Sequence, residues 1–517
     1  MKKFLNSRIL RLETFVIFFT SLIALFALYL SYQHDAILLF NDGNAHLNTA
    51  RRVIDNVTPG FVQLGSVWLP FFHILLIPFV LSDFLWKTGI AGSIVNGISF
   101  ILSGWLLFKL VDYITQNKWN GVISTLLFAT NANMLYMQTT PMDEPVLIVT
   151  SLASIYFICR WARENSLNYL IYSAFFIFLA SLTRYDGWSL FIAIGTYIIY
   201  ISLFIRHKGK GGKEGPLMIF IFLGGFGIVL WFLYNIAIFN DPLYFASGEY
   251  SAHAQQAILL THKVLPTFHN LGLDFLTYGM AVLLNVGLLS SILMIFGIIH
   301  YLYKNFNKPE EWGALLLLVV FVFNIAALYL GHSVIWLPNI SPFLNTYFNV
   351  RYGVLMIPAA AFFVGYLASA GRFIRFTLFI CILFQGLVFL QPSLLPAFGG
   401  IGGITTMKDT VSSVSEPTKH ASSYLSSHYH GGYILVSSAS EDSFIFHTKV
   451  PLKNYITEGT GSYWKKSLQR PEEYATWIVF FVNRSDRVGR IVGQKNNLSR
   501  FFNRRYLDNT FEIWEKK

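Results

Sequence analysis

Ionisable side chains interrupt the apolar runs of this chain at few positions, and those positions are where chemistry is to be expected. A charged group near a lipid boundary is costly to desolvate and is usually tied to function. A desolvated carboxylate can act as a general base, and a guanidinium can bind a phosphate through paired hydrogen bonds. The polar side chains with this potential are Asp42, His46, Asp143, Glu144, Arg184, Asp186, His253, Gln255, Gln256, His332 and Arg351.

The first group lies in segment 40–52. Asp42 stands at the start of a predicted helix, and His46 follows one turn later on the same face. Two interpretations of Asp42 remain open. Asp is a favoured N-cap residue, and a desolvated carboxylate could instead take a proton from an attacking hydroxyl. Arg51 and Arg52, at the end of the segment, fit basic side chains that extend to lipid headgroups.

Asp143 and Glu144 lie in the short connection 138–145. Acidic residues complement the dipole in the first turn of a helix, so capping is one explanation for the pair. The alternative is that the two carboxylates position an acceptor or hold a divalent cation, Mg²⁺ or Mn²⁺, because these ions prefer oxygen ligands. Such a cation is the one cofactor that the sequence suggests, and no metal ligand is assigned.

Arg184 and Arg351 have two options each. Arg184 belongs to the string Arg-Tyr-Asp-Gly-Trp over 184–188, whose Tyr and Trp are typical of membrane-interface anchors. Arg351 lies at the start of a late apolar run. Either guanidinium can reach outward to headgroups or face inward and bind a lipid phosphate. For Arg351 we favour the inward orientation.

The loop 240–256 is long for this chain and rich in hydrogen-bonding side chains, among them His253 and Gln256. Such a loop can recognise a sugar or a lipid headgroup, or it can be an ordinary solvated loop. His253, His262 and His269 lack the spacing of a zinc site, so we predict none.

The polar candidates lie between long apolar runs, and the helices that these runs form must position them. The chain is 54% hydrophobic and 13% charged, with a mean hydropathy of +0.51, which excludes an ordinary soluble protein of this size. A bilayer core of about 30 Å needs roughly 20 apolar residues of helix. The predicted spans are 13–32, 88–112, 119–139, 144–161, 168–183, 188–205, 217–239, 276–302, 312–330, 353–370 and 376–396. A shorter run, 68–81, contains Pro70 and Pro78 and is predicted to be interfacial or re-entrant.

Basic residues fix the predicted orientation, because Lys and Arg collect in cytoplasmic loops. With the N-terminus inside, the outer loop 241–273 contains only Lys263. The polar candidates then all face away from the cytosol, in the plasma membrane. The predicted cytoplasmic loops hold Lys118, Arg160, Arg163, Arg206, Lys208, Lys210, Lys213, Lys304, Lys308, Arg372 and Arg375.

The tail is different in composition. It is Ser-rich up to about 430, and then short β-type runs follow at 433–437, 477–481 and 511–514. We therefore predict an all-α polytopic membrane bundle of about 11 transmembrane helices with a small extracytoplasmic α/β domain. The bundle covers 1–399, including a first outer loop at 33–87 and an outer loop at 240–275, and the tail domain covers 400–517.

The order of these motifs resembles the GT-C class of integral-membrane glycosyltransferases, which contains protein O-mannosyltransferases and lipid A aminoarabinose transferases. The resemblance implies a polyprenyl-phosphate sugar donor, an acceptor that is a lipid, a glycan or a protein, and an inverting transfer. It assigns the general base to Asp42 and secondary active-site roles to Asp143 and Glu144. Substrate binding falls to His46, Arg184, Asp186, His253, Gln256, Arg351 and Tyr352.

Two other classes of function remain open. A flippase for lipid-linked glycans or another transporter would also place polar groups in a helical bundle, but such proteins often carry them near mid-helix. Here they gather at predicted helix ends, which favours chemistry at the membrane surface. A scaffold that binds a partner through its tail has no motif in its favour. The formal charge of +11 does not indicate nucleic-acid binding, because the basic residues are scattered between apolar runs.

Overall fold

The computed structural model describes residues 2–205, 214–248, 251–338, 340, 347–390, 416–495 and 498–517. The helices before residue 206 are α1 (Lys2–Gln33), α2 (Asn41–Arg52), η1 (Phe61–Leu64), α3 (Phe71–Val80), α4 (Asp83–Thr88), α5 (Ile90–Thr115), α6 (Lys118–Ala129), α7 (Ala132–Met137), α8 (Glu144–Glu164), α9 (Leu167–Ser181), α10 (Asp186–Tyr200) and η2 (Ile201–Ile205). Those from 214 to 390 are α11 (Gly215–Gly224), α12 (Phe226–Phe239), α13 (Tyr244–Ser247), α14 (Ala252–Thr261), α15 (Leu271–Val286), α16 (Leu288–Asn305), η3 (Pro309–Leu318), α17 (Val319–Tyr329), η4 (Val350–Met356), α18 (Ile357–Leu367), η5 (Ala368–Ala370) and α19 (Arg372–Leu390).

The helical part matches the predicted membrane bundle. Within the described residues, eight helices are long and apolar enough to cross a bilayer. The predicted run 168–183 forms the shorter α9, and 68–81 contains α3 with Pro78 inside it. The predicted end of the last span, 376–396, lies outside the described residues. The eight helices are Leu12–Gln33, Ile90–Thr115, Glu144–Glu164, Asp186–Ile205, Gly215–Phe239, Leu288–Asn305, Pro309–Tyr329 and Val350–Ala370.

One predicted span, 276–302, is wrong as a continuous helix. The structure breaks it at Gly287, whose φ of +88° favours glycine and separates α15 from α16. The Gln385 side chain pairs with backbone groups at the break. Its Nε2 donates to the carbonyl of Val286 (2.9 Å), and its Oε1 accepts from the amide of Ser290 (3.0 Å). A break in an apolar run is tolerated when the freed backbone groups are paired in this way.

The predicted span 119–139 is also broken, into α6 and α7. Asn131 makes the break stable in two ways. Its Oδ1 accepts from the amide of Met134 (3.0 Å), which caps α7, and its Nδ2 donates to the carbonyl of Asn285 (2.8 Å) near the end of α15. The breaks at Asn131 and Gly287 are therefore neighbours in space, and the buried amide side chains of Asn131 and Gln385 stabilise them.

Helices α16 and α18 pack closely at Gly297, where an added Cβ would lie 2.3 Å from the carbonyl oxygen of Phe363. Gly297→Ala is expected to lower stability by about 1–3 kcal/mol, because the backbones would have to separate. The measurement is the melting temperature of the purified protein. Gly279→Ala is the control, since nothing lies within 4 Å of a Cβ built at Gly279. Equal melting temperatures for the two variants would contradict the packing.

The tail folds as the predicted α/β domain around a five-stranded sheet of order β2-β1-β3-β5-β4. Strand β1 pairs in parallel with β2 and β3, while β5 pairs antiparallel with β3 and β4. The three predicted strand regions correspond to β1, β3 and β5, and the sequence did not reveal β2 and β4. The strands are β1 (Ile434–Leu435), β2 (Tyr455–Ile456), β3 (Trp477–Phe481), β4 (Phe502–Leu507) and β5 (Phe511–Lys516). The helices are α21 (Glu416–His428), α22 (Ser438–Thr448), η6 (Leu452–Asn454), η7 (Glu458–Thr460), α23 (Ser462–Gln469), α24 (Pro471–Tyr474), α25 (Arg487–Ile491) and α26 (Leu498–Phe501).

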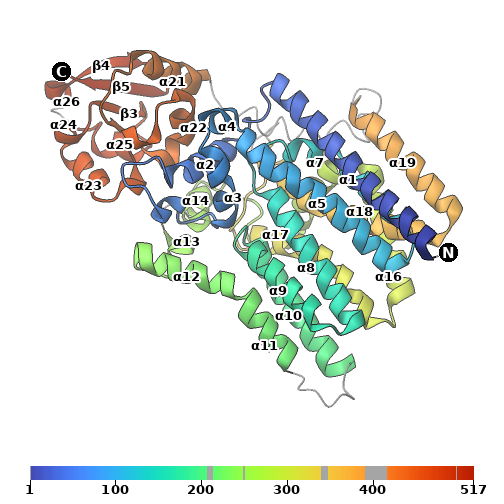
Figure 1. Ribbon diagram of the computed structural model, residues 1–517. Coiled ribbons are helices and arrows are strands. Elements are labelled where there is room, and N and C mark those ends of the chain that lie inside the picture. The colour runs from blue at the N-terminus through green and yellow to red at the C-terminus, as the bar shows by residue number, and fades with distance from the viewer. Residues whose placement is uncertain are drawn as a thin grey trace.

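The tail domain lies at one end of the molecule, and the short helices α2 to α4 lie between it and the long helices (Figure 1). One hydrophobic cluster joins both parts, with Leu47 and Phe72 on one side and Phe444 and Phe446 on the other. The predicted boundary between 399 and 400 lies outside the described residues.

Polar contacts reinforce this junction. Arg52 and the amide of Asn48 both bind the Asp442 carboxylate of α22. Arg51 forms two ion pairs: its Nε lies 3.1 Å from Oδ2 of Asp55, and its Nη2 lies 2.7 Å from Oδ1 of Asp83. The interpretation of Arg51 and Arg52 as headgroup contacts is therefore wrong for both side chains. Instead, the tail domain holds the helix that carries Asp42.

Candidate active site

Asp42 lies in the first turn of α2 and not at its N-cap. The helix begins at Asn41, and Phe40 occupies the N-cap position without a side-chain cap, so the capping interpretation of Asp42 is wrong. The Asp42 carboxylate instead faces Arg351, with Oδ2 2.5 Å from Nη2. Its side chain is 43% exposed, which leaves the carboxylate open to a ligand.

Glu144 lies at the centre of the site. It is the first residue of α8 and is fully buried. Its Oε1 is 3.4 Å from Nη1 of Arg184 and 3.4 Å from Nε of Arg351, so two guanidinium groups share one carboxylate oxygen. Its Oε2 is buried without a hydrogen-bond partner among the described residues. An acceptor left unpaired in this way is a place for a ligand hydroxyl.

Arg184 connects the remaining acids. Its Nη1 lies 2.8 Å from Oδ1 of Asp143, and its Nε lies 3.1 Å from Oδ2 of Asp186. Asp143 occupies the N-cap position of α8 without capping it, so the capping explanation fails for its side chain as well. Burial raises the pKa of the Asp143 carboxyl above its usual range, against the opposing effect of Arg184. The ring of Tyr352 lies 5.3 Å from both guanidinium carbons, close enough for cation–π attraction.

The six charged side chains define what we call the carboxylate–guanidinium cluster: Asp42, Asp143, Glu144, Arg184, Asp186 and Arg351. Four acids share two cations, and acids crowded together cannot all remain ionised at low cost. This crowding favours the protonated form of the acids, in the same direction as the raised pKa of Asp143.

The cluster does not fit a bound metal ion. Arg184 stands between three of the carboxylates. Among the residues that the structure describes, no three His, Cys, Asp or Glu side chains are grouped so that they could hold a metal ion. Within the described residues, the positive charge of the cluster comes from the two guanidinium groups.

His46 borders the cluster, with its Nδ1 2.8 Å from Nε2 of His73 and its ring centroid 4.4 Å from that of Trp68. His73 and Trp68 were missed as site residues, because a single histidine or tryptophan in an apolar run has no distinguishing pattern. Burial lowers the pKa of His46 to about 4, in spite of the opposing field of Asp42 and Glu144. The imidazole is therefore neutral at physiological pH.

This pKa predicts acid sensitivity. The folded value of about 4 lies below the unfolded value of 6.5, so the unfolded chain binds a proton first. The free energy of unfolding should fall as pH drops from about 6.5 to about 4, by up to about 3 kcal/mol from this group. His46→Gln should reduce that pH dependence in a chemical denaturation series. His262→Gln is the control, and an unchanged slope for His46→Gln would contradict the prediction.

The structure does not connect every predicted residue to the cluster. His253 and Gln256 lie on α14, and no hydrogen bond, ion pair or ring contact joins either to the cluster within the described part of the chain. The ring of His253 faces that of His332, with 5.9 Å between the centroids, and Gln256 is buried with no partner for its Oε1 in the part of the chain that the structure describes. Loop composition predicted polarity there but could not predict position.

Comparisons with known proteins concern the fold and part of the sequence. Residues 71–234 match the model of the family described as dolichyl-phosphate-mannose-protein mannosyltransferase. No curated protein matches the chain in sequence. ArnT from Cupriavidus metallidurans, in its structure bound to undecaprenyl phosphate, shares 11% identity over 96% of this chain and 97% of its own, with a TM-score of 0.55.

A second fold match is the Archaeoglobus fulgidus oligosaccharyltransferase tethered to an acceptor peptide. It shares 10% identity over 98% of this chain and 74% of its own length, with a TM-score of 0.50. At such identities the likeness concerns the fold. The resemblance that the motifs indicated is thus confirmed: this chain has the fold of the GT-C class of membrane glycosyltransferases, with a family sequence match over residues 71–234.

Proposed function

We propose that this protein transfers a sugar, a hexose or a pentose, from a polyprenyl-phosphate carrier to an acceptor hydroxyl at the extracytoplasmic face of the plasma membrane. The observation that carries the proposal is the carboxylate–guanidinium cluster, in which an exposed carboxylate is paired with a buried arginine. The undecaprenyl phosphate in the similarly folded ArnT supports the class of donor.

Arg351 and Arg184 would bind the donor phosphate. A guanidinium presents paired donors to phosphate oxygens, and in a low-dielectric site it stabilises the charge that develops on the leaving group. Asp42 is the most exposed of the acids that pair with them, with 43% of its side chain accessible. Phosphate entry would therefore displace Asp42 from Arg351 and leave its carboxylate free to act.

The transfer is a single displacement. The acceptor oxygen attacks the anomeric carbon, and the bond from that carbon to the phosphate oxygen breaks with its electron pair going to the phosphate. The hydroxyl proton goes to Asp42. Attack from the side opposite the leaving group inverts the anomeric centre. Oε2 of Glu144 and Oδ1 of Asp186, which have no hydrogen-bond partner among the described residues, would accept hydrogen bonds from sugar hydroxyls.

The test uses the purified full-length protein in nanodiscs. It is supplied with radiolabelled polyprenyl-phosphate mannose or polyprenyl-phosphate aminoarabinose and a panel of lipid, glycan and peptide acceptors. Labelled product together with free polyprenyl phosphate is the expected result. Movement of the labelled lipid between leaflets of proteoliposomes without release of the sugar would instead support a flippase.

A further inference from the structure

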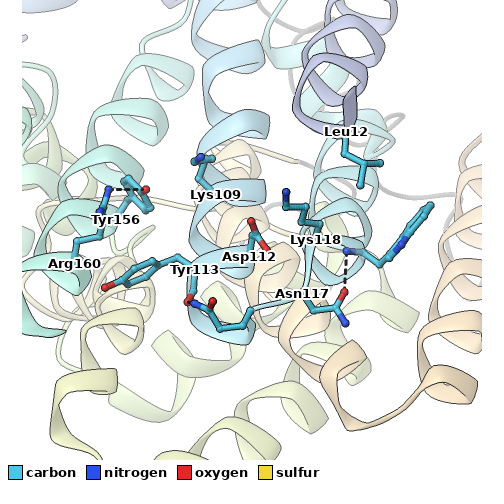
Figure 2. Close-up of a pocket in the computed structure, with 10 residues that line it drawn as sticks. Leu12, Lys109, Asp112, Tyr113, Asn117, Lys118, Tyr156 and Arg160 are labelled. Carbon is cyan, nitrogen blue, oxygen red and sulfur yellow. Dashed lines mark hydrogen bonds between the residues drawn. The ribbon is translucent and has the colours of Figure 1, made fainter. Parts of the chain in front are cut away.

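A cavity of about 740 Å³ lies far from the carboxylate–guanidinium cluster. It is formed by the C-terminal ends of α5 and α8, the start of α6 and Leu12 of α1 (Figure 2). Arg160 at its edge is sixteen residues along α8 from Glu144, roughly 24 Å. The proposed glycosyl transfer therefore makes no use of this cavity. Its volume is in the range of about 300–1,000 Å³ that small ligands occupy.

Two of the cations at this cavity already have acidic partners. Nζ of Lys109 lies 2.5 Å from Oε1 of Glu13, and Nε of Arg160 lies 2.9 Å from Oε1 of Glu164. The third cation, Lys118, differs from them. Its Nζ is buried and has no hydrogen-bond partner among the described residues. Burying an ammonium without a hydrogen-bond partner costs free energy, so a ligand that supplies an acceptor for Lys118 would be stabilising.

Asp112 supplies the opposite charge. Figure 2 shows its carboxylate and the Lys118 ammonium as neighbours beside the cavity. The two groups do not form an ion pair, and the Asp112 carboxylate has no side-chain hydrogen bond within the described ranges. Among the described side chains at and beside the cavity, the charges of Lys109, Lys118 and Arg160 balance those of three carboxylates. A neutral site with one unpaired group of each sign is complementary to a zwitterion and not to a simple anion.

The position of the cavity indicates the source of the ligand. It lies at the ends of three helices that are long and apolar enough to cross a membrane: α1, α5 and α8. Tyr113 and Trp119 line it, and Trp119 is 57% exposed. Aromatic side chains of this kind are typical of the level of lipid headgroups.

We propose that this cavity binds the phosphoethanolamine headgroup of a membrane phospholipid, with the phosphate on Lys118 and the primary ammonium on Asp112. Contact with the phosphate requires the end of the Lys118 side chain to turn toward the cavity, which a long lysine side chain can do. A primary ammonium donates hydrogen bonds to a carboxylate, whereas the quaternary ammonium of phosphocholine has no N–H to donate. The site should therefore discriminate between these two zwitterionic headgroups.

Native mass spectrometry of the full-length protein tests the proposal, with phosphatidylethanolamine, phosphatidylcholine and phosphatidylglycerol of matched chains. The wild type should prefer phosphatidylethanolamine about tenfold over each of the others, the size of one good charge-assisted contact. Asp112→Asn and Lys118→Gln should each abolish that preference. Glu310→Gln and Lys304→Gln, outside the cavity lining, should keep it.

Comparing lipids within one sample gives a ratio that does not depend on how much folded protein each variant yields. Equal binding of the three lipids by the wild type would overturn the proposal. Tighter binding of phosphatidylglycerol by Asp112→Asn, together with a wild-type preference for that lipid, would show a site for anions and would also overturn it. Displacement of the lipid by equimolar free O-phosphoethanolamine would contradict a membrane lipid as the ligand.

Discussion

Asp42→Asn is expected to lower kcat for sugar transfer by about 10²- to 10⁴-fold, and the KM for the donor should not rise, because a neutral amide competes less well than the carboxylate for Arg351. The amide keeps the size of the side chain but cannot take the acceptor proton at neutral pH, and a positioned base contributes about that factor. The measurement is steady-state transfer from the radiolabelled polyprenyl-phosphate sugar that the wild type accepts.

Asp83→Asn is the matched control for this variant. Asp83 is also a carboxylate of the segment before α5 and is also paired with an arginine, but it lies outside the carboxylate–guanidinium cluster. It should leave kcat unchanged. If Asp42→Asn transferred sugar at the wild-type rate, Asp42 would not be the base.

Arg351→Gln is expected to raise the KM for the donor strongly, because Arg184 alone would hold the phosphate, and to destabilise the protein. The change leaves the buried Glu144 with Arg184 as its one cationic partner among the described residues, and it removes the Arg351 partner of Asp42. Breaking a buried ion pair by removing one partner costs about 3–5 kcal/mol. Melting temperature and KM for the donor measure the two effects separately.

A double substitution separates stability from function. Arg351→Gln combined with Glu144→Gln also neutralises the buried carboxylate that is left with Arg184 alone, so it should recover part of the lost stability. It should not recover transfer, because the phosphate would still lack its guanidinium. Arg375→Gln is the control, since the Nε of Arg375 donates to the amide oxygen of Asn120 (2.9 Å). Recovery of transfer by the double variant would contradict a phosphate-binding role for Arg351.

The sequence predicts candidate residues because their chemical type is unusual for their surroundings. Acids and arginines at the ends of apolar runs stand out, and the structure brings Asp42, Glu144 and Arg351 together. Their pairing could not be predicted. Asp42 and Arg351 are 309 positions apart, and no local pattern carries information about a contact that only the packed bundle creates.

The errors in the fold have a similar origin. Hydropathy shows where a chain is apolar but not where a helix breaks, so Gly287 and Asn131 were both placed inside continuous spans. The breaks depend on tertiary partners, such as the Gln385 side chain, that complete the freed backbone. The contact between Arg52 and Asp442 of the tail domain could not be predicted for the same reason. In the sequence, Arg52 has the pattern of an interfacial arginine, and its partner lies 390 residues away.

The most direct test of the central claim is an experimental structure of the full-length protein with undecaprenyl phosphate bound. We expect the phosphate within hydrogen-bond distance of both Arg351 and Arg184, with the Asp42 carboxylate released from Arg351 and facing the space beside the phosphate. A phosphate bound elsewhere, with the contact between Asp42 and Arg351 intact, would contradict the proposed mechanism.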